Sequence, residues 1–218
     1  KLPIHTKCHP TLPVEESLRL SKSALRRGLL DTVYLHEALS GENDSFLRLK
    51  QLAAHLTDDI TELGVSIYEL PEFYAAVEAP EVSVIQVPLS LFDRRFGNRD
   101  LLKLAHREKK KVYVRSVLLQ GVLVSESRHL PHFLAGLDPY LRGLREISQS
   151  TGVPLLRLAL NYVRQFTELS GVIVGISTKS ELEGLMLEAN RPIDSEVFNL
   201  LENLHVPPRE LVDPRNWR

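Results

Sequence analysis

Cysteine is almost absent from this chain of 218 residues, in which Cys8 is the only one. A single thiol excludes an intramolecular disulfide and any metal site built from a cysteine cluster. His129 and His132 stand three apart, but no third histidine or carboxylate cluster is close by, so we predict no metal site. The lack of disulfides also favours a reducing compartment, and we expect a cytoplasmic protein.

Long apolar runs and an excess of one charge are missing as well. No stretch approaches the roughly 20 apolar residues that span a bilayer, and the first residues lack the apolar core of a signal peptide. The 27 basic residues balance 28 acidic ones, which leaves a net charge of -1. This balance provides no excess of positive charge with which to bind nucleic acid or an anionic membrane. A small-molecule substrate is therefore the expected partner, and the oligomeric state stays open.

Six short apolar runs alternate with longer amphipathic segments. The runs are rich in Val, Ile or Tyr and cover residues 3–6, 32–35, 63–66, 82–87, 111–114 and 172–174. Helices are predicted for residues 14–27, for a segment capped by Ser45, and for residues 71–77, 100–110, 137–149, 154–166 and 180–188. Six strand-plus-helix units of roughly 25–40 residues predict an α/β fold with a parallel sheet and crossover helices.

The number of units favours a barrel. A (β/α)8 TIM barrel takes eight units and about 250 residues, so this chain predicts one domain over residues 1–218 that lacks two units. A doubly wound open sheet is the alternative, but no G-x-G-x-x-G follows any of the runs. Chemistry in such barrels lies where strands end. The polar residues at these ends are Lys7, His36, Ser66, Gln86, Arg115 with Ser116, and the turn from Gly175 to Lys179.

Motifs surround these strand ends in a fixed order. They are Thr6-Lys7, then Asp31 to His36, Gly64-Val65-Ser66, Val84-Ile85-Gln86, Arg115 to Gly121, Pro154 to Tyr162 and Val172 to Ser180. Together they resemble the aldo-keto reductase superfamily over nearly the whole chain. The resemblance implies that strands three to eight of the barrel are present and that its N-terminal quarter precedes Lys1. Residues 115–123 and 213–217 are most similar to a bacterial subgroup associated with surface-polysaccharide and spore-coat gene products.

The resemblance implies NAD(P)H-dependent reduction of an aldehyde or ketone, including a sugar-derived carbonyl, by a tetrad of Asp, Tyr, Lys and His. Lys7 would supply the ammonium that a phenol with a pKa near 10 needs to act as the acid. His36 would orient the carbonyl or share its proton. Lys1, in a T-K-L-P variant of the site, is the alternative to Lys7. The Asp and the Tyr would come from the preceding units.

The same resemblance implies NADP as cofactor, with NAD as the alternative. Ser66 and Gln86 would hold the nicotinamide carboxamide, although Ile67 replaces the Asn that usually follows this Ser. Arg115 replaces a stacking Tyr, and a planar guanidinium can also lie flat on a ring. The residues implied along the phosphates are Ser116, Leu118 and Gly121, and at the start of a helix Gly175, Ser177, Thr178 and Lys179.

Two other functions stay open. The chain can be a non-catalytic relative that binds a nucleotide or a partner protein. It can also be a barrel lyase or aldolase that forms a Schiff base on Lys7. The second alternative does not explain why the motifs occur together and in order.

Overall fold

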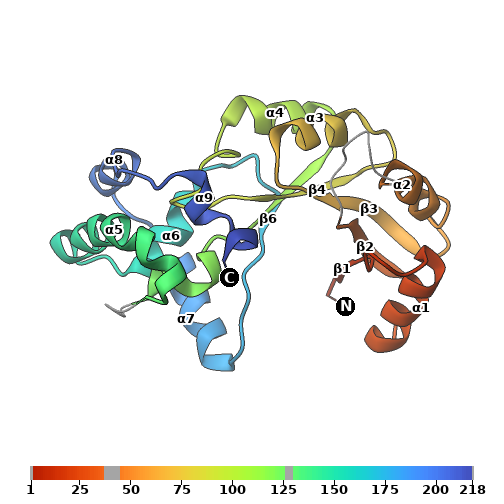
Figure 1. The fold of residues 1–218 in the computed structure, drawn as a ribbon, viewed down its shortest axis with the longest axis horizontal. Helices are drawn as coiled ribbons and strands as arrows, with labels where there is room; N and C mark the ends of the chain where they lie inside the picture. The colour runs from red at the N-terminus through yellow and green to blue at the C-terminus, as the bar shows by residue number, and fades with distance from the viewer. Residues whose placement is uncertain (1, 37–44, 126–129, 218) are drawn as a thin grey trace. The chain divides into compact units, whose positions relative to one another are not determined.

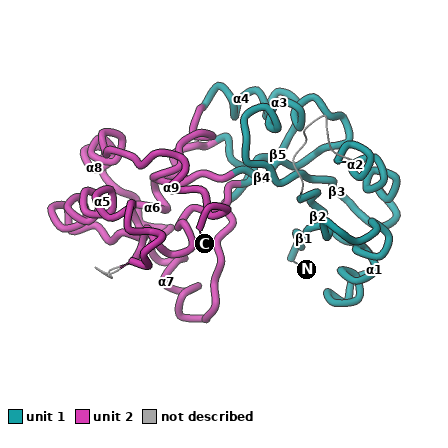
Figure 2. Tube along the Cα trace, viewed as in Figure 1, with its two compact units in different colours: residues 1–87, 99–113, 168–171 teal, residues 88–98, 114–167, 172–218 magenta. Residues whose placement is uncertain are grey.

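The computed structural model describes residues 2–36, 45–125 and 130–217 (Figure 1). Lys1 and His129, both named above, lie outside the described residues. The chain gathers into two compact units, coloured separately in Figure 2. Unit 1 comprises residues 1–87, 99–113 and 168–171, and unit 2 comprises residues 88–98, 114–167 and 172–218.

Strands and helices alternate along the described residues, as the sequence predicts. The strands are β1 (His5–Lys7), β2 (Leu30–Leu35), β3 (Ile60–Ser66), β4 (Val84–Pro88), β5 (Lys111–Arg115) and β6 (Gly171–Val172). The α-helices are α1 (Val14–Leu25), α2 (Ser45–Ala53), α3 (Leu70–Glu78), α4 (Arg99–Arg107), α5 (Asp138–Thr151), α6 (Leu155–Arg164), α7 (Lys179–Ala189), α8 (Ser195–Glu202) and α9 (Arg209–Val212). The 3₁₀ helices are η1 (Leu119–Val124), η2 (His132–Leu137) and η3 (Pro214–Asn216).

The strands form one sheet in the order β1-β2-β3-β4-β5-β6, so each strand pairs with the next in the sequence. The pairs from β1 to β4 are parallel, with partners such as Lys7 and Tyr34 or Ser66 and Gln86. Backbone bonds from Lys111 N–H to the Ser83 carbonyl and from Ser170 N–H to the Val112 carbonyl continue this order. The parallel α/β fold is thereby confirmed.

Burial explains why β2 and β4 are apolar runs without a polar–apolar alternation. All residues of β4 are buried, and in β2 Asp31 alone is partly exposed. Parallel strands covered on both faces show near-continuous apolar sequence. In Figure 2, helices α1–α4 of unit 1 lie along one side of its strands.

Helix α1 begins at the predicted residue and ends two residues before the predicted bound of 27. Glu15 and Glu16 lie in the first turn and Lys22 in the last, each at the dipole end of opposite sign. The helix ends at Leu25, and Arg26, with a φ of 51°, takes the left-handed position that follows the last turn. Ser45, predicted to cap the next helix, is instead the first residue of α2.

Helices α5, α6 and α8 pack together in unit 2 (Figure 1). Their buried side chains include Leu141, Leu144, Leu158, Val163 and Leu201. Asp213, near the end of the chain, is also buried, and the Arg215 guanidinium holds the pKa of its carboxyl below the usual value. Within the described ranges, no helix combines the length and the apolar character needed to cross a membrane.

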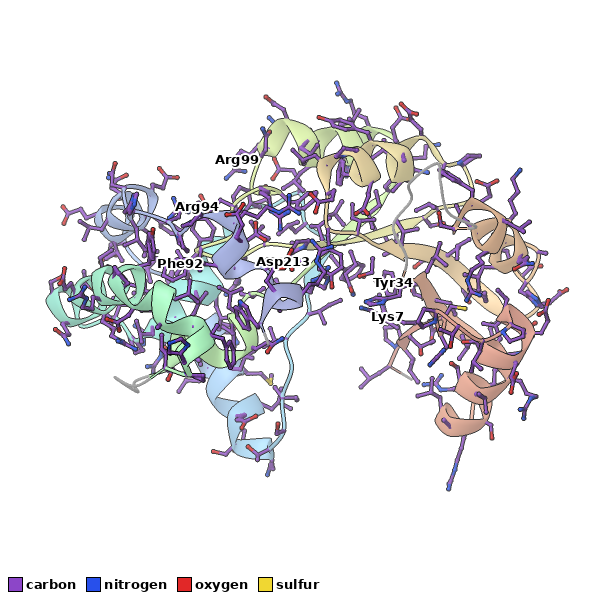
Figure 3. All side chains as sticks on the ribbon, viewed as in Figure 1. Lys7, Tyr34, Phe92, Arg94, Arg99 and Asp213 are labelled. Carbon is purple, nitrogen blue, oxygen red and sulfur yellow. The ribbon has the colours of Figure 1, made fainter. Side chains whose placement is uncertain are left out.

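Arg94 is hydrogen-bonded to the C-terminal end of α8 in unit 2 (Figure 3). Its guanidinium donates to the carbonyl oxygens of Leu201, at 2.7 Å, and Glu202, at 3.0 Å, and lies 5.1 Å from the centre of the Tyr162 ring. We expect Arg94→Ala to lower the free energy of unfolding by about 2 kcal/mol, because these charged hydrogen bonds and the cation–π contact are lost. Urea unfolding measures the effect. Arg142→Ala, whose side chain is 65% exposed on α5, is the control, and equal losses in both variants would contradict the prediction.

Candidate active site

Three predicted side chains form a hydrogen-bonded chain across β1, β3 and β4, with Lys7 and Ser66 at the ends of their strands and Gln86 in the middle of β4. The Lys7 Nζ donates to the Ser66 Oγ at 3.5 Å, and the Ser66 hydroxyl donates to the Gln86 Oε1 at 2.9 Å. Ser66 is 2% and Gln86 4% exposed, whereas Lys7 is exposed. Because parallel strands end at the same edge of a sheet, residues 59 apart in the sequence meet here.

Lys7 and His36 line the same groove, which has a volume of about 370 Å³. The other lining residues come from the connection between β1 and α1 and from α1 itself: Cys8, His9, Pro10, Leu12, Ser17, Leu20 and Ser21. His36 is exposed and directly follows β2. A groove of this size matches the lower range of small-ligand sites and places an ammonium and an imidazole at one opening.

Tyr34 is the register partner of Lys7 (Figure 3) but is not suited to act as the acid. Its side chain is fully buried, and its hydroxyl forms a 2.8 Å hydrogen bond with His5 Nδ1. Burial, and then the nearby Tyr113 and Glu62, raise the pKa of the Tyr34 phenol well above its ordinary value. A phenol with a raised pKa is a weaker proton donor.

Two glycines make room for tyrosine rings beside this site. A Cβ at Gly64 would stand 2.5 Å from Cδ1 of Tyr34, and one at Gly171 would stand 2.7 Å from Cε1 of Tyr113. His5 contacts both rings, with centroid distances of 5.7 Å to Tyr34 and 4.9 Å to Tyr113. We call His5, Tyr34 and Tyr113 the aromatic layer. His5, its member on β1, stands two residues before Lys7 and therefore on the same face of that strand.

The predicted cofactor residues after β5 belong to unit 2. The Arg115 guanidinium donates to the Ser116 Oγ at 3.3 Å, and the Leu118 carbonyl accepts from the Gly121 amide. Left-handed backbone occurs at Ser116, Leu119, Gln120 and Gly121, with φ of 61°, 45°, 52° and 88°. Non-glycine residues in this region store strain, which is concentrated at functional sites. These conformations could not be predicted from residue type, because Gly121 is the one residue of the four that favours a positive φ.

Gly175, Ser177, Thr178 and Lys179 lie exposed in unit 2, where the chain enters α7. The Thr178 hydroxyl caps the helix by accepting from the Glu181 amide at 3.1 Å. In return, the Ser177 amide donates to the Glu181 carboxylate at 2.7 Å. An amide predicted to meet a phosphate thus already bonds an anionic group of the chain.

Arg48 of α2 is a residue of this region that sequence reasoning missed. Its guanidinium contacts the connection between β1 and α1, which forms part of the groove wall. A lone arginine on an amphipathic helix carries no sequence signal for such a role. Among the residues that the structure describes, no group of three His, Cys, Asp or Glu side chains is placed to hold a metal ion.

Several solved structures share this fold. The aldo-keto reductase AKR11C1 from Bacillus halodurans is 22% identical to this chain in both its apo and its holo form. The apo form has a TM-score of 0.72 and covers 95% of this chain and 74% of that chain. The holo form has a TM-score of 0.73 and covers 96% of this chain and 75% of that chain. An aldo/keto reductase from Klebsiella pneumoniae, in complex with NADP and acetate, is 17% identical, with a TM-score of 0.67 over 94% of this chain and 71% of that chain.

At these identities the solved structures show the fold alone. No protein of curated function matches the chain. The family itself is shown by a separate comparison, in which residues 3–205 match the Aldo/keto reductase family. The match covers far more than half of the sequence, and the chain therefore belongs to the aldo/keto reductase family.

Proposed function

We propose that this chain is an NAD(P)H-dependent oxidoreductase that reduces an aldehyde or ketone, with a sugar-derived carbonyl as one substrate class. Family membership supports oxidoreduction. The observation that carries the proposal is the hydrogen-bonded chain of Lys7, Ser66 and Gln86 beside a groove that Lys7 shares with His36. In this proposal residues 1–218 form one domain, and β1–β6 are the third to eighth strands of the barrel.

Lys7 and His36 act on the carbonyl oxygen of the substrate. When hydride adds to the carbonyl carbon, negative charge develops on the oxygen, and a nearby ammonium and imidazole N–H stabilise that charge. A neutral imidazole can donate one such hydrogen bond near physiological pH. Both side chains line the groove, so a small carbonyl compound can reach the two together.

Ser66 and Gln86 fit the carboxamide of a nicotinamide. The two groups are almost completely buried and are held together at 2.9 Å, and a carboxamide offers both a donor and an acceptor to such a pair. When bound, the reduced nicotinamide supplies the hydride. The remaining proposed cofactor contacts are Arg115, Ser116, Leu118, Gly121, Gly175, Ser177, Thr178 and Lys179.

The proposed cofactor is NADP, with NAD as the alternative. The NADP in the Klebsiella pneumoniae structure supports the first, and the exposed Lys179 supplies a positive charge near the start of α7. The Glu181 carboxylate, which accepts from the Ser177 amide, favours NAD, because its negative charge opposes a phosphate group at the start of α7. Titration with both cofactors decides between them.

Fluorescence titration of the complete encoded protein with NADPH and NADH tests this proposal. Ser66→Ala is expected to weaken binding roughly 3- to 10-fold, because one hydrogen bond of ordinary strength is lost. Ser23→Ala, an exposed serine on α1, is the matched control and should bind as the parent does. If neither cofactor binds to the parent protein, the proposal is wrong.

Consumption of NADPH in the presence of glyceraldehyde, a small hydroxylated aldehyde, tests the reaction itself. If the protein binds NADPH but does not consume it with any of a panel of aldehydes and ketones, the result would support the alternative that the chain is a non-catalytic relative. Aldehyde carbon retained on Lys7 after borohydride treatment would support a Schiff-base lyase, because borohydride reduces an imine to a stable amine.

A further inference from the structure

Arg48 holds the connection between β1 and α1 from a neighbouring helix. Its guanidinium donates to the His9 carbonyl oxygen at 2.6 Å and to the Leu12 carbonyl oxygen at 3.0 Å. The nitrogen that contacts His9 also lies 3.5 Å from the Cys8 Sγ. A guanidinium is a planar fork of donors, so one side chain can fix two carbonyl groups at a set separation.

These contacts add to the other hydrogen bonds that the connection makes. Residues 8–13 form no helix or strand, although four of them line the groove. The Cys8 amide donates to the Tyr34 carbonyl oxygen at 2.8 Å, and the His9 amide donates to the Ser17 Oγ at 2.8 Å. Both of these bonds lie at the start of the connection. At the far end, the Pro13 carbonyl oxygen accepts from the Ser17 amide at 3.0 Å, and Arg48 adds a side-chain hydrogen bond at Leu12.

The position of Arg48 in the chain links the two candidate catalytic residues. The connection directly follows Lys7, and α2, which carries Arg48, is the first helix after His36 among the described residues. A shift of α2 relative to residues 8–13 would therefore change the groove that Lys7 and His36 share. Displacements of about 1 Å in such a site reduce rates by up to roughly 100-fold.

We infer that Arg48 is a positioning residue of this groove: by fixing residues 8–13 against α2, it sets the wall against which the carbonyl substrate lies. This inference rests on the proposed function, since it assigns the groove at Lys7 and His36 to that substrate. The carbonyl group of His9 belongs to an exposed residue and can be hydrated when the guanidinium is removed. Loss of Arg48 should thus loosen the connection without unfolding unit 1.

Arg48→Met, which keeps the length of the side chain but removes its donors, tests the inference. We expect the KM for glyceraldehyde to rise about 10-fold, with the Kd of NADPH unchanged within about 2-fold, because a wall of the substrate groove is loosened while Ser66 and Gln86 stay in place. Cys8, the only cysteine of the chain and 2% exposed, reports on the loop directly. The rate at which the Cys8 thiol reacts with a disulfide reagent should rise at least about 10-fold, because this rate is proportional to the fraction of molecules in which the loop is open.

Arg19→Met is the matched control, because Arg19 is an arginine of α1 whose side chain is 69% exposed. It should change neither KM nor the reaction of Cys8. If Arg48→Met does not fold, Arg48→Lys, which keeps the charge but lacks the fork, undergoes the same measurements with the same expected directions. Parent-like KM and Cys8 reactivity in the folded variant would overturn the inference. If the parent binds neither cofactor, the proposed function fails, while the Cys8 measurement still decides whether Arg48 holds the loop.

Discussion

Lys7→Met is expected to lower kcat/KM for carbonyl reduction by about 10²- to 10⁴-fold, the range typical for loss of a group that stabilises charge or transfers a proton in the transition state. The Lys7 ammonium, at the end of β1, lines the groove and is hydrogen-bonded to Ser66, which with Gln86 forms the proposed carboxamide site. Methionine keeps much of the side-chain volume but removes the charge. The Kd of NADPH should rise less than about 3-fold, because Ser66 and Gln86 keep their mutual hydrogen bond.

Lys103→Met is the control for this experiment. Lys103 is an exposed lysine of α4 in the same unit, 4.0 Å from Asp100, and its loss should leave kcat/KM unchanged. Steady-state NADPH consumption gives both parameters for each variant. If the kcat/KM of Lys7→Met lies within about 3-fold of the parent value, Lys7 is not a catalytic residue.

Gly64→Ala should lower the free energy of unfolding by about 3 kcal/mol, the upper part of the range for overpacking a core. The new methyl group would stand 2.5 Å from the Tyr34 ring and 3.1 Å from the backbone oxygen of Val84. The ring cannot move aside freely, because it is fully buried and its hydroxyl is hydrogen-bonded to His5. For a chain of this size, that loss corresponds to a fall in Tm of roughly 6–12 °C.

Thermal unfolding followed by circular dichroism measures this change. Gly28→Ala is the matched control, since nothing lies within 4 Å of a Cβ at Gly28, and we expect a change below about 0.5 kcal/mol. The cause is checked with Tyr34→Leu, which removes the ring that the methyl group would meet. In the double variant the two losses should be far from additive, and additive losses would mean that Tyr34 is not the obstacle.

The strands and the residues at their ends could be predicted from the sequence for a physical reason. Strands buried on both faces must be apolar throughout, so runs such as residues 82–87 mark them, and the observed strands begin and end within three residues of the predicted bounds. A parallel sheet then brings all carboxyl ends to one edge. Lys7, Ser66 and Gln86 meet there as the ordered motifs suggest.

What the sequence could not indicate depends on contacts between distant side chains or on backbone conformation. Arg48 resembles any other arginine of an amphipathic helix until its distance to His9 and Leu12 is known. Helix α8 was not predicted, because its short segment lies beyond the regular alternation. The left-handed conformations of Leu119 and Gln120 run against the preference of their residue types, so tertiary contacts must impose them.

The order of the strands also has a consequence for how the chain folds. Because each strand pairs with its neighbour in the sequence, the pairings from β1 to β4 close loops of only about 20–30 residues, and closure of such loops costs little entropy. The contact between Val112 and Ser170, which brings β6 beside β5, spans 58 residues. During synthesis strands β1–β4 can therefore assemble one after another. We expect β6 to join last, after α5 and α6 have formed.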